Sequence, residues 1–188
     1  MRKNFKPNTM LFPMPVLIIS TYNEDGSVDC MNAAWSTMED NDVILLELSK
    51  EHQTSENILR EKAFCVSVCD KKNVVQGDFV GIVSNKTDKN KFKKTKWTEK
   101  RSENVSAPII EELPLCLECK LDHIREEDGE FAVYGKIVSV SVNEDILDEK
   151  GKIDLKKAQF LTFLPFDNSY HTISEKVANA FLDGLKLR

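Results

Sequence analysis

The chain has 188 residues, of which 41% are hydrophobic and 30% are charged, and its formal net charge is −5 at pH 7. A chain of this length and composition predicts a single globular domain, residues 1–188, with enough apolar side chains for a sizeable core. The negative overall charge argues against nucleic acid or an anionic membrane as the main partner, and no apolar run reaches the roughly 18 residues that a membrane helix needs.

The N-terminal segment shares one feature with signal peptides, because Arg2, Lys3 and Lys6 precede an apolar run. Pro13 and Pro15 interrupt that run, and no small-residue cleavage site follows it. We therefore expect a cytoplasmic protein without a membrane segment.

Two strands joined by a tight turn come next, at residues 14–22 and 28–36. Val16 to Ile19 is a run of β-branched and aliphatic residues, which favours a strand. Asp25-Gly26 lies between the two apolar runs and supplies the positive φ angles that a hairpin turn needs. The sequence therefore predicts an antiparallel pair of strands.

The second of these strands departs from simple alternation. After Asp29 and Cys30 it reads Met31-Asn32-Ala33-Ala34-Trp35. Small side chains among polar ones let backbone amides approach a flat ligand, and the tryptophan would fix the position of that ligand. The alternative is a strand that turns at the rim of a barrel, and the residues by themselves favour this alternative.

A short helix is predicted at residues 54–61, with Thr54 as its N-cap. Lys50, His52 and Asn57 lie around its start. Free amides and the positive end of the helix dipole make such a terminus an anion site. A lysine and a cap before a helix are also common without any ligand, so both interpretations stay open.

The remaining elements alternate between strands and less regular segments. Residues 71–82 and 87–96 are expected to be helical or irregular, and Pro108 and Pro114 to bracket an extended connector. Further strands are predicted at 43–49, 63–69, 115–124, 130–142 and 159–164, and an amphipathic C-terminal helix starting at Ser174 and including Val177, Phe181 and Leu182.

Short strands with regularly spaced turns predict a mainly β protein, a β-barrel with helical decoration. Gly77 and Gly81 are too widely spaced for the dinucleotide fingerprint, so no resident NAD domain is expected. No serine–histidine–carboxylate or paired-carboxylate arrangement stands out, so no catalytic residue is assigned and no metal site is expected.

Five cysteines occur, and the odd number disfavours a full disulfide framework. Cys116 and Cys119 form a Cys-x-x-Cys pair in a predicted strand, where residues three apart point to opposite faces. Cys65 and Cys69 are four apart in another strand, too distant for a disulfide. We read these four as small core residues, and Cys30 stays open.

Residues 86–101 contain seven lysines and one arginine against Asp88 and Glu99, a local charge of +6. Such a run most often forms a solvated helical face. A basic patch that faces a phosphate-bearing ligand is the second interpretation, and nucleic-acid binding is the third.

The motifs together resemble one known family. In chain order they are Pro13-x-Pro15-Val16-x-x-Ile19-Ser20-Thr21, Asp25-Gly26, Ala34-Trp35, Lys50-Glu51-His52-x-Thr54-x-x-Asn57-Ile58, Ala63-Phe64-Cys65-Val66, Val80-Gly81-Ile82-Val83-Ser84, Asn90-Lys91-Phe92, Ala107-Pro108-Ile109-Ile110, Leu117-Glu118-Cys119-Lys120, Gly135-Lys136-Ile137-Val138, Tyr170 and Glu175. They cover about residues 10–182, and their order is more specific than any single motif. The chain is similar to the flavin-reductase-like, FMN-binding split-barrel family, which includes the flavoredoxins.

This resemblance implies an FMN-binding split barrel with FMN as cofactor. It implies that one segment binds the flavin phosphate and that a second borders the isoalloxazine ring, with further contacts elsewhere. The implied cofactor-binding residues are Lys50, His52, Thr54 and Asn57 for the phosphate, Met31, Asn32, Ala33, Ala34 and Trp35 for the ring, and Ser84, Lys91 and Tyr170.

The sequence departs from the family pattern at three positions. Asp29 stands where asparagine is frequent, and we expect its carboxylate to face solvent. Asn85 follows Ser84 where the family commonly has glycine. Lys86 is the residue present here in place of an arginine that the family often has nearby. His171, beside Tyr170, is either a surface histidine or a contact to flavin or substrate.

The resemblance implies an oxidoreductase, an NAD(P)H-dependent flavin reductase in which hydride passes from the nicotinamide to FMN. The alternative is a flavoredoxin-like FMN electron-transfer protein without NAD(P)H activity, and in both cases a redox protein is a candidate electron acceptor. A binding module built on residues 86–101 is a third, weaker hypothesis. The resemblance also implies a homodimer, with Trp35 and the C-terminal region near the interface.

Overall fold

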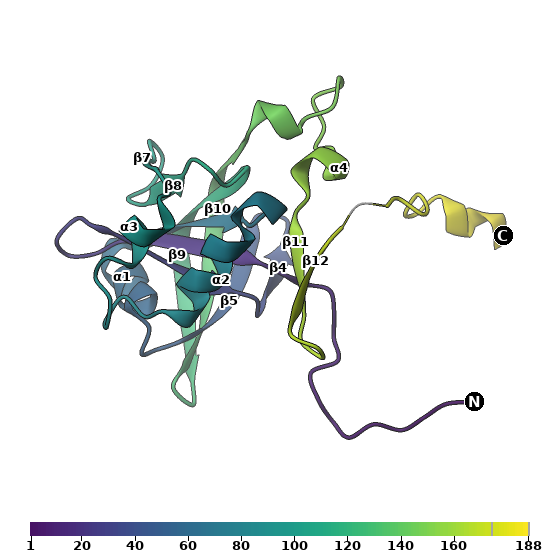
Figure 1. The fold of residues 1–188 in the computed structure, drawn as a ribbon, viewed down its shortest axis with the longest axis horizontal. Helices are drawn as coiled ribbons and strands as arrows, with labels where there is room; N and C mark the ends of the chain where they lie inside the picture. The colour runs from purple at the N-terminus through teal and green to yellow at the C-terminus, as the bar shows by residue number, and fades with distance from the viewer. Residues whose placement is uncertain (174, 188) are drawn as a thin grey trace.

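The computed structural model describes residues 1–173 and 175–187, and its largest element is a curled antiparallel sheet. The strand order in this sheet is β3-β2-β6-β9-β10-β5-β4. The strands are β2 (Leu17–Tyr22), β3 (Val28–Ala33), β4 (Ser36–Asp40), β5 (Val43–Ser49), β6 (Ala63–Val68), β9 (Leu115–Glu127) and β10 (Glu130–Val142). The sheet curls into a barrel (Figure 1), so the mainly β fold predicted from the sequence is confirmed.

Helices and two small sheets decorate this barrel (Figure 1). The helices are α1 (Gln53–Glu61), α2 (Val74–Ile82), α3 (Lys91–Thr95) and α4 (Leu155–Ala158), with 3₁₀ turns at Lys71–Asn73, Glu144–Ile146 and Asp183–Leu187. One small sheet pairs β1 (Met14–Pro15), β11 (Leu161–Leu164) and β12 (Ser169–Thr172), and the other pairs β7 (Glu99–Arg101) with β8 (Pro108–Ile110). Both chain ends extend away from the barrel (Figure 1).

The two hairpin turns depend on residues that accept positive φ. In the β2–β3 turn, Gly26 has φ +80° and the Asp25 carboxylate accepts a hydrogen bond from the Ser27 amide. In the long β9–β10 hairpin, Asp128 and Gly129 have φ of 51° and 84°. The β9–β10 turn therefore has two consecutive residues at positive φ, whereas in the β2–β3 turn only Gly26 does, and both predicted hairpins form.

Side-chain alternation sorts the core into separate clusters on the two faces of the sheet. Inside the barrel, Leu46, Phe64 and Val133 pack together with other fully buried residues. Cys119 belongs to this cluster, whereas Cys116 packs into a different one under β8. All five cysteines are buried and free. The prediction that Cys116 and Cys119 point to opposite faces is therefore confirmed.

Three predicted boundaries are wrong. The strand expected at 28–36 ends at Ala33, and β4 starts at Ser36, because the chain leaves the β2 edge and crosses to β5. Pro108, expected in a connector, begins β8 and pairs with Arg101. The N-cap of α1 is His52 and not Thr54, whose hydroxyl instead donates to the carboxylate of Asp29.

The predicted C-terminal helix is not found in the residues that the structure describes. Its expected start, Ser174, lies outside them. Residues 175–179 have no regular structure, and Val177 and Phe181 are exposed. An amphipathic pattern alone does not form a short helix in water without a surface on which to bury its apolar face.

A buried carboxylate fixes the loop between β7 and β8. Glu118 accepts hydrogen bonds from the Ser102 hydroxyl and from the Asn104 side-chain amide. Burial opposes ionisation, but these bonds and one from Ser139 outweigh it and hold the pKa of Glu118 below its usual value. The native state therefore favours the ionised form more than the unfolded chain does.

This depressed pKa makes a prediction for acid stability. The contribution of Glu118 to the free energy of unfolding is complete above its unfolded pKa of about 4.3 and is lost as pH falls through the lower native pKa. Urea midpoints measured from about pH 6 down to 3 are expected to fall less steeply for Glu118→Gln than for the wild type. Equal slopes in the two proteins would contradict this origin of the acid sensitivity.

Candidate functional site

Two adjacent pockets lie between β3, α2 and the start of α1. The first, which we call the polar pocket, has a volume of about 230 Å³ and is lined by Asp29, Met31, Asn32, His52, Gln53, Thr54, Val80, Gly81, Ile82, Val83, Ser84, Asn85 and Lys91. The second, the aromatic pocket, has a volume of about 330 Å³ and is lined by Val16, Met31, Asn32, Ala33, Ala34, Trp35, Glu47, Leu48, His52, Asp78, Gly81, Ile82, Phe163 and Tyr170. Because the two share part of their walls, one elongated ligand could occupy both.

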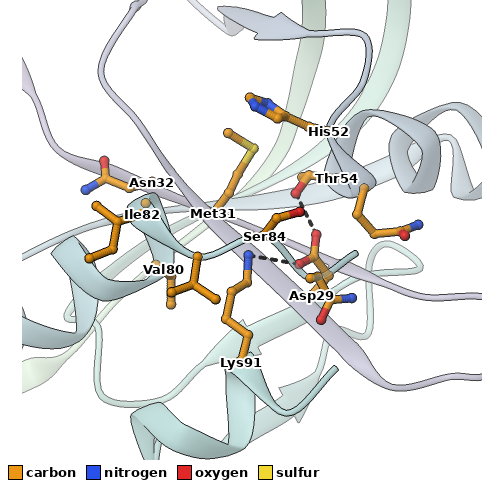
Figure 2. Close-up of a pocket in the computed structure, with 13 residues that line it drawn as sticks. Asp29, Met31, Asn32, His52, Thr54, Val80, Ile82, Ser84 and Lys91 are labelled. Carbon is orange, nitrogen blue, oxygen red and sulfur yellow. Dashed lines mark hydrogen bonds and ion pairs between the residues drawn. The ribbon is translucent and has the colours of Figure 1, made fainter. Parts of the chain in front are cut away.

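A buried ion pair forms one wall of the polar pocket (Figure 2). Asp29 is 0% exposed and Lys91 only 3%, and Lys91 Nζ lies 3.3 Å from Asp29 Oδ1. Thr54 Oγ1 donates a hydrogen bond of 2.6 Å to Asp29 Oδ2. The expectation that Asp29 faces solvent is wrong, because a cation and a hydroxyl donor together compensate the cost of burying its charge.

The first turn of α1 also faces the polar pocket. Gln53 and Thr54 begin this nine-residue helix, and both line the pocket. Amides in the first turn of a helix have no partner within the helix, and the helix dipole favours negative charge beside them. This arrangement supports the anion-site interpretation of the helix start.

A second, independent feature of the polar pocket is an unsatisfied amide. Asn85 is 2% exposed, yet neither its Nδ2 nor its Oδ1 has a hydrogen-bond partner among the described residues. Buried polar atoms without partners are rare in folded proteins and often mark the place of a ligand or water. Asn85 therefore offers one donor and one acceptor to whatever enters the pocket.

The aromatic pocket is wider and more apolar. Ala33, Ala34 and Trp35 line one part of it, at the end of β3, and Phe163 and Tyr170 line another, from the β11–β12 hairpin. The small side chains leave room for a flat group beside the backbone. This wall matches the flat-ligand interpretation of the segment that contains them.

A tyrosine–aspartate contact lies at the edge of the aromatic pocket. Tyr170 Oη donates a hydrogen bond of 2.8 Å to Asp78 Oδ1 of α2. Burial, together with this bond, raises the pKa of Tyr170 to about 12, so the phenol is neutral and a donor at physiological pH. Asn32 Nδ2 donates to Gly77 O at 3.0 Å, which ties β3 to the same helix.

The structure brings most of the predicted site residues together. Ten of them line one or both pockets: Met31, Asn32, Ala33, Ala34, Trp35, His52, Thr54, Ser84, Lys91 and Tyr170. His171 lines neither pocket; its exposed ring contacts Ser169 Oγ through Nε2. Cys30 is buried, and burial raises the pKa of its thiol to about 12, so it is a core residue without reactivity.

Two predicted residues lie outside both pocket walls. Lys50 points toward the tip of the β9–β10 hairpin, where its Nζ lies 2.5 Å from Glu126 Oε1 in an exposed ion pair. Asn57 is buried and donates hydrogen bonds to Thr21 and Asn23. Lys50 therefore contacts the β9–β10 hairpin, and Asn57 ties α1 to the β2–β3 hairpin. Neither side chain reaches the cavity.

The lysines of the basic run at residues 86–101 differ in their partners and in their exposure. Lys86 pairs with Glu56 and Lys94 with Asp88, both on the surface. Lys91 alone among these three is buried at the pocket. The segment is therefore mostly a solvated face, with one cation turned toward the site.

Sequence reasoning missed several lining residues, among them the polar Gln53, Asp78 and Asn85 and the glycine at position 81, Gly81. Asn85 carries a signal, because it is the departure from the Ser-Gly pattern of the resembling family. Asp78 and Gly81 are brought to the site by the packing of α2 against β3, which no local pattern indicates. Within the described part of the chain no cluster of three metal-ligating side chains is found, and no helix is long and apolar enough to span a membrane.

Comparison with known proteins identifies the family to which this fold belongs. Residues 9–174 match the family of the flavin reductase like domain. The structure is similar to flavoredoxin of Desulfovibrio vulgaris (Miyazaki F), with TM-score 0.92 and 30% identity over 98% of this chain and 100% of that one. It is also similar to flavoredoxin from Methanosarcina acetivorans, with TM-score 0.87 and 26% identity over 100% of both chains. An uncharacterized protein of Methanothermobacter thermautotrophicus is 29% identical over an alignment of 188 positions, which covers 95% of this chain and 87% of that protein.

Proposed function

The chain belongs to the flavin reductase-like family, and on that premise we propose that it is an FMN-dependent oxidoreductase whose flavin takes hydride from NAD(P)H. The observation that carries the proposal is the pair of adjacent pockets, one polar and one apolar with small residues. FMN has the same division into a phosphate end and a flat ring. We further propose that the chain acts as a single cytoplasmic domain.

The residues of the polar pocket fit a phosphate. Asn85 has an unpartnered donor, the first turn of α1 faces the cavity, and the Lys91 ammonium lies at its wall. These donors suit a phosphate monoester at a helix N-terminus. The absence of a dinucleotide fingerprint favours FMN over FAD as the bound flavin.

In the aromatic pocket the proposed roles are positioning and shape. Ala33 and Ala34 leave space for the ring, and Trp35 and Tyr170 border it. When bound, the flavin supplies the redox chemistry, and the protein contributes binding, orientation and electrostatics. Asp78 holds the Tyr170 hydroxyl in one direction, and no side chain is needed as a catalytic acid or base.

Anaerobic mixing tests the proposal. Protein loaded with FMN is expected to lose the visible absorption band of the oxidised flavin when NADH or NADPH is added. Dithionite provides the control, because it reduces bound flavin without a nucleotide site. In a separate titration, protein is added to FMN and the fluorescence of FMN is followed. If this fluorescence does not change at any protein concentration, the pockets do not bind flavin and the proposal fails.

The similarity to two flavoredoxins favours a second candidate, an FMN electron carrier without its own NAD(P)H activity. Its electrons would pass to and from redox-protein partners. The same experiment separates the two candidates. Reduction by dithionite but by neither nucleotide supports the carrier, and reduction by a nucleotide supports the reductase.

We also propose a homodimer, because large apolar side chains are exposed on the extended chain ends and beside the aromatic pocket. Trp35 is 55% exposed, Leu11 83% and Phe181 98%. Exposed apolar groups of this size favour burial against another surface. Sedimentation equilibrium at micromolar concentration is expected to give twice the chain mass of 21.4 kDa. A single chain mass across that concentration range would contradict the dimer.

A further inference from the structure

We propose that Asp29 lowers the contribution of the flavin phosphate to binding, so that this site takes riboflavin and FMN with similar affinities and releases FMN readily. The inference rests on the proposed function, since it assumes that the phosphate occupies the polar pocket. It concerns a buried carboxylate at the wall of that pocket.

Lys91 is the cation that could pair with a phosphate, but it already has a counter-ion. Among the described residues that line the polar pocket, Asp29 and Lys91 are the ones with full charges, and His52 adds a titratable ring. Lys91 Nζ points at Asp29 Oδ1 from 3.3 Å (Figure 2). The pair is electrically neutral as a unit, so the pocket offers little net positive charge to an anion.

Asp29 also opposes the phosphate directly. Its Oδ1 accepts no hydrogen bond from the described residues, and the contact with Lys91 is a longer ion pair. An under-solvated carboxylate close to a bound phosphate repels it, and this repulsion is strong because water is excluded from a buried site. A ligand without the phosphate, such as riboflavin, escapes this repulsion.

Structure alone does not require the negative charge. The hydrogen bond from Thr54 Oγ1 goes to Asp29 Oδ2, and the carbonyl oxygen of an asparagine could accept the same bond. Asp29→Asn therefore keeps the size of the side chain and the contact to α1, and removes the charge. Lys91 is then left without a counter-ion until a phosphate arrives.

The measured quantity is the ratio of the riboflavin Kd to the FMN Kd, from titrations followed by flavin fluorescence. We expect a ratio below about ten for the wild type. Asp29→Asn is expected to raise the ratio by about ten- to a hundredfold, the usual worth of one hydrogen bond to a charged group. Lys91→Gln is expected to lower it, and the Asp29→Asn/Lys91→Gln double variant to return it near the wild-type value, because its pocket is neutral again.

Glu56→Gln is the matched control. Glu56 is an exposed carboxylate on α1, paired with Lys86, and its removal changes the total charge of the protein by the same amount. Solvent and salt screen this site, so the ratio should stay within about twofold of the wild type. A change as large as that of Asp29→Asn would assign the effect to overall charge and overturn the proposal.

Thermal unfolding adds a readout without fluorescence. In Asp29→Asn the unpaired ammonium destabilises the free protein, so FMN and inorganic phosphate should each raise the unfolding temperature more than they do in the wild type. If Asp29→Asn does not fold, the comparison of Lys91→Gln with the double variant decides, because removal of Asp29 must again raise the Kd ratio.

The outcomes separate the two levels of the argument. If neither flavin binds the wild type, the proposed function fails. If flavins bind but the ratio in Asp29→Asn is unchanged or lower, Asp29 serves to orient Lys91 and Thr54 for the phosphate, and the inference fails while the proposed function stands.

Discussion

Replacement of Gly81 by leucine is expected to weaken the binding of FMN and riboflavin alike by about a hundredfold. Gly81 lies on α2 in the wall that the two pockets share, and a Cβ atom at this position would already lie 3.0 Å from the Asn32 Cβ. The further atoms of leucine have to enter the cavity. Overpacking of this kind costs about 3 kcal/mol at its upper range, which corresponds to this loss of affinity.

The stability of the variant distinguishes obstruction from unfolding. Gly81 is helical, so leucine improves helix propensity by somewhat less than about 1 kcal/mol. The unfolding temperature should therefore hold or rise while flavin binding is lost. Val75→Leu on the same helix is the control, because Val75 is 74% exposed and is not one of the residues that line the two pockets. Equal binding by Gly81→Leu and wild type would show that the flavin lies elsewhere.

Gly135→Ala is expected to destabilise the fold by about 3 kcal/mol or more, in the upper range for overpacked cores. A Cβ atom at Gly135 would meet Phe64 Cζ well inside van der Waals contact, and Phe64 is fully buried. Gly135 lies on β10 and pairs with Leu121 of β9 on one side and with Ile44 of β5 on the other, so the backbone has no simple way to retreat. Urea denaturation measures the loss.

A second substitution tests this cause. Phe64→Leu alone should destabilise by leaving a cavity, but in the Gly135→Ala background it removes the clash, so the double variant should lose less stability than the sum of the two changes. Gly184→Ala is the control, since no atom lies within 4 Å of a Cβ there. Strict additivity of the two core changes would refute the steric explanation.

The sequence predicts the parts of this fold that are decided locally. Gly26 and the pair Asp128-Gly129 adopt the positive φ angles of hairpin turns, and the strands that these turns join form where apolar residues alternate. The opposite faces of Cys116 and Cys119 follow from strand geometry alone. These features need no information from distant residues.

The parts that could not be predicted are decided by contacts across the fold. Asp29 is buried because Lys91, far along the chain, pairs with it, and the hydroxyl of Thr54 is used for the same carboxylate and not for capping. Gly81 and Asp78 reach the site only through the packing of α2 on β3. A local pattern identifies a residue type and spacing, but it does not show which charge finds which partner.

The contact between Tyr170 and Asp78 joins residues 92 positions apart, and the walls of both pockets are assembled from similarly distant segments. Pairings of such high sequence separation form late, because the chain has to close large loops before they give any stabilisation. A ligand that contacts all these segments at once has no binding site in a partly folded chain. Bound flavin is therefore expected to lower the rate of unfolding of the native protein and to leave the rate of folding unchanged.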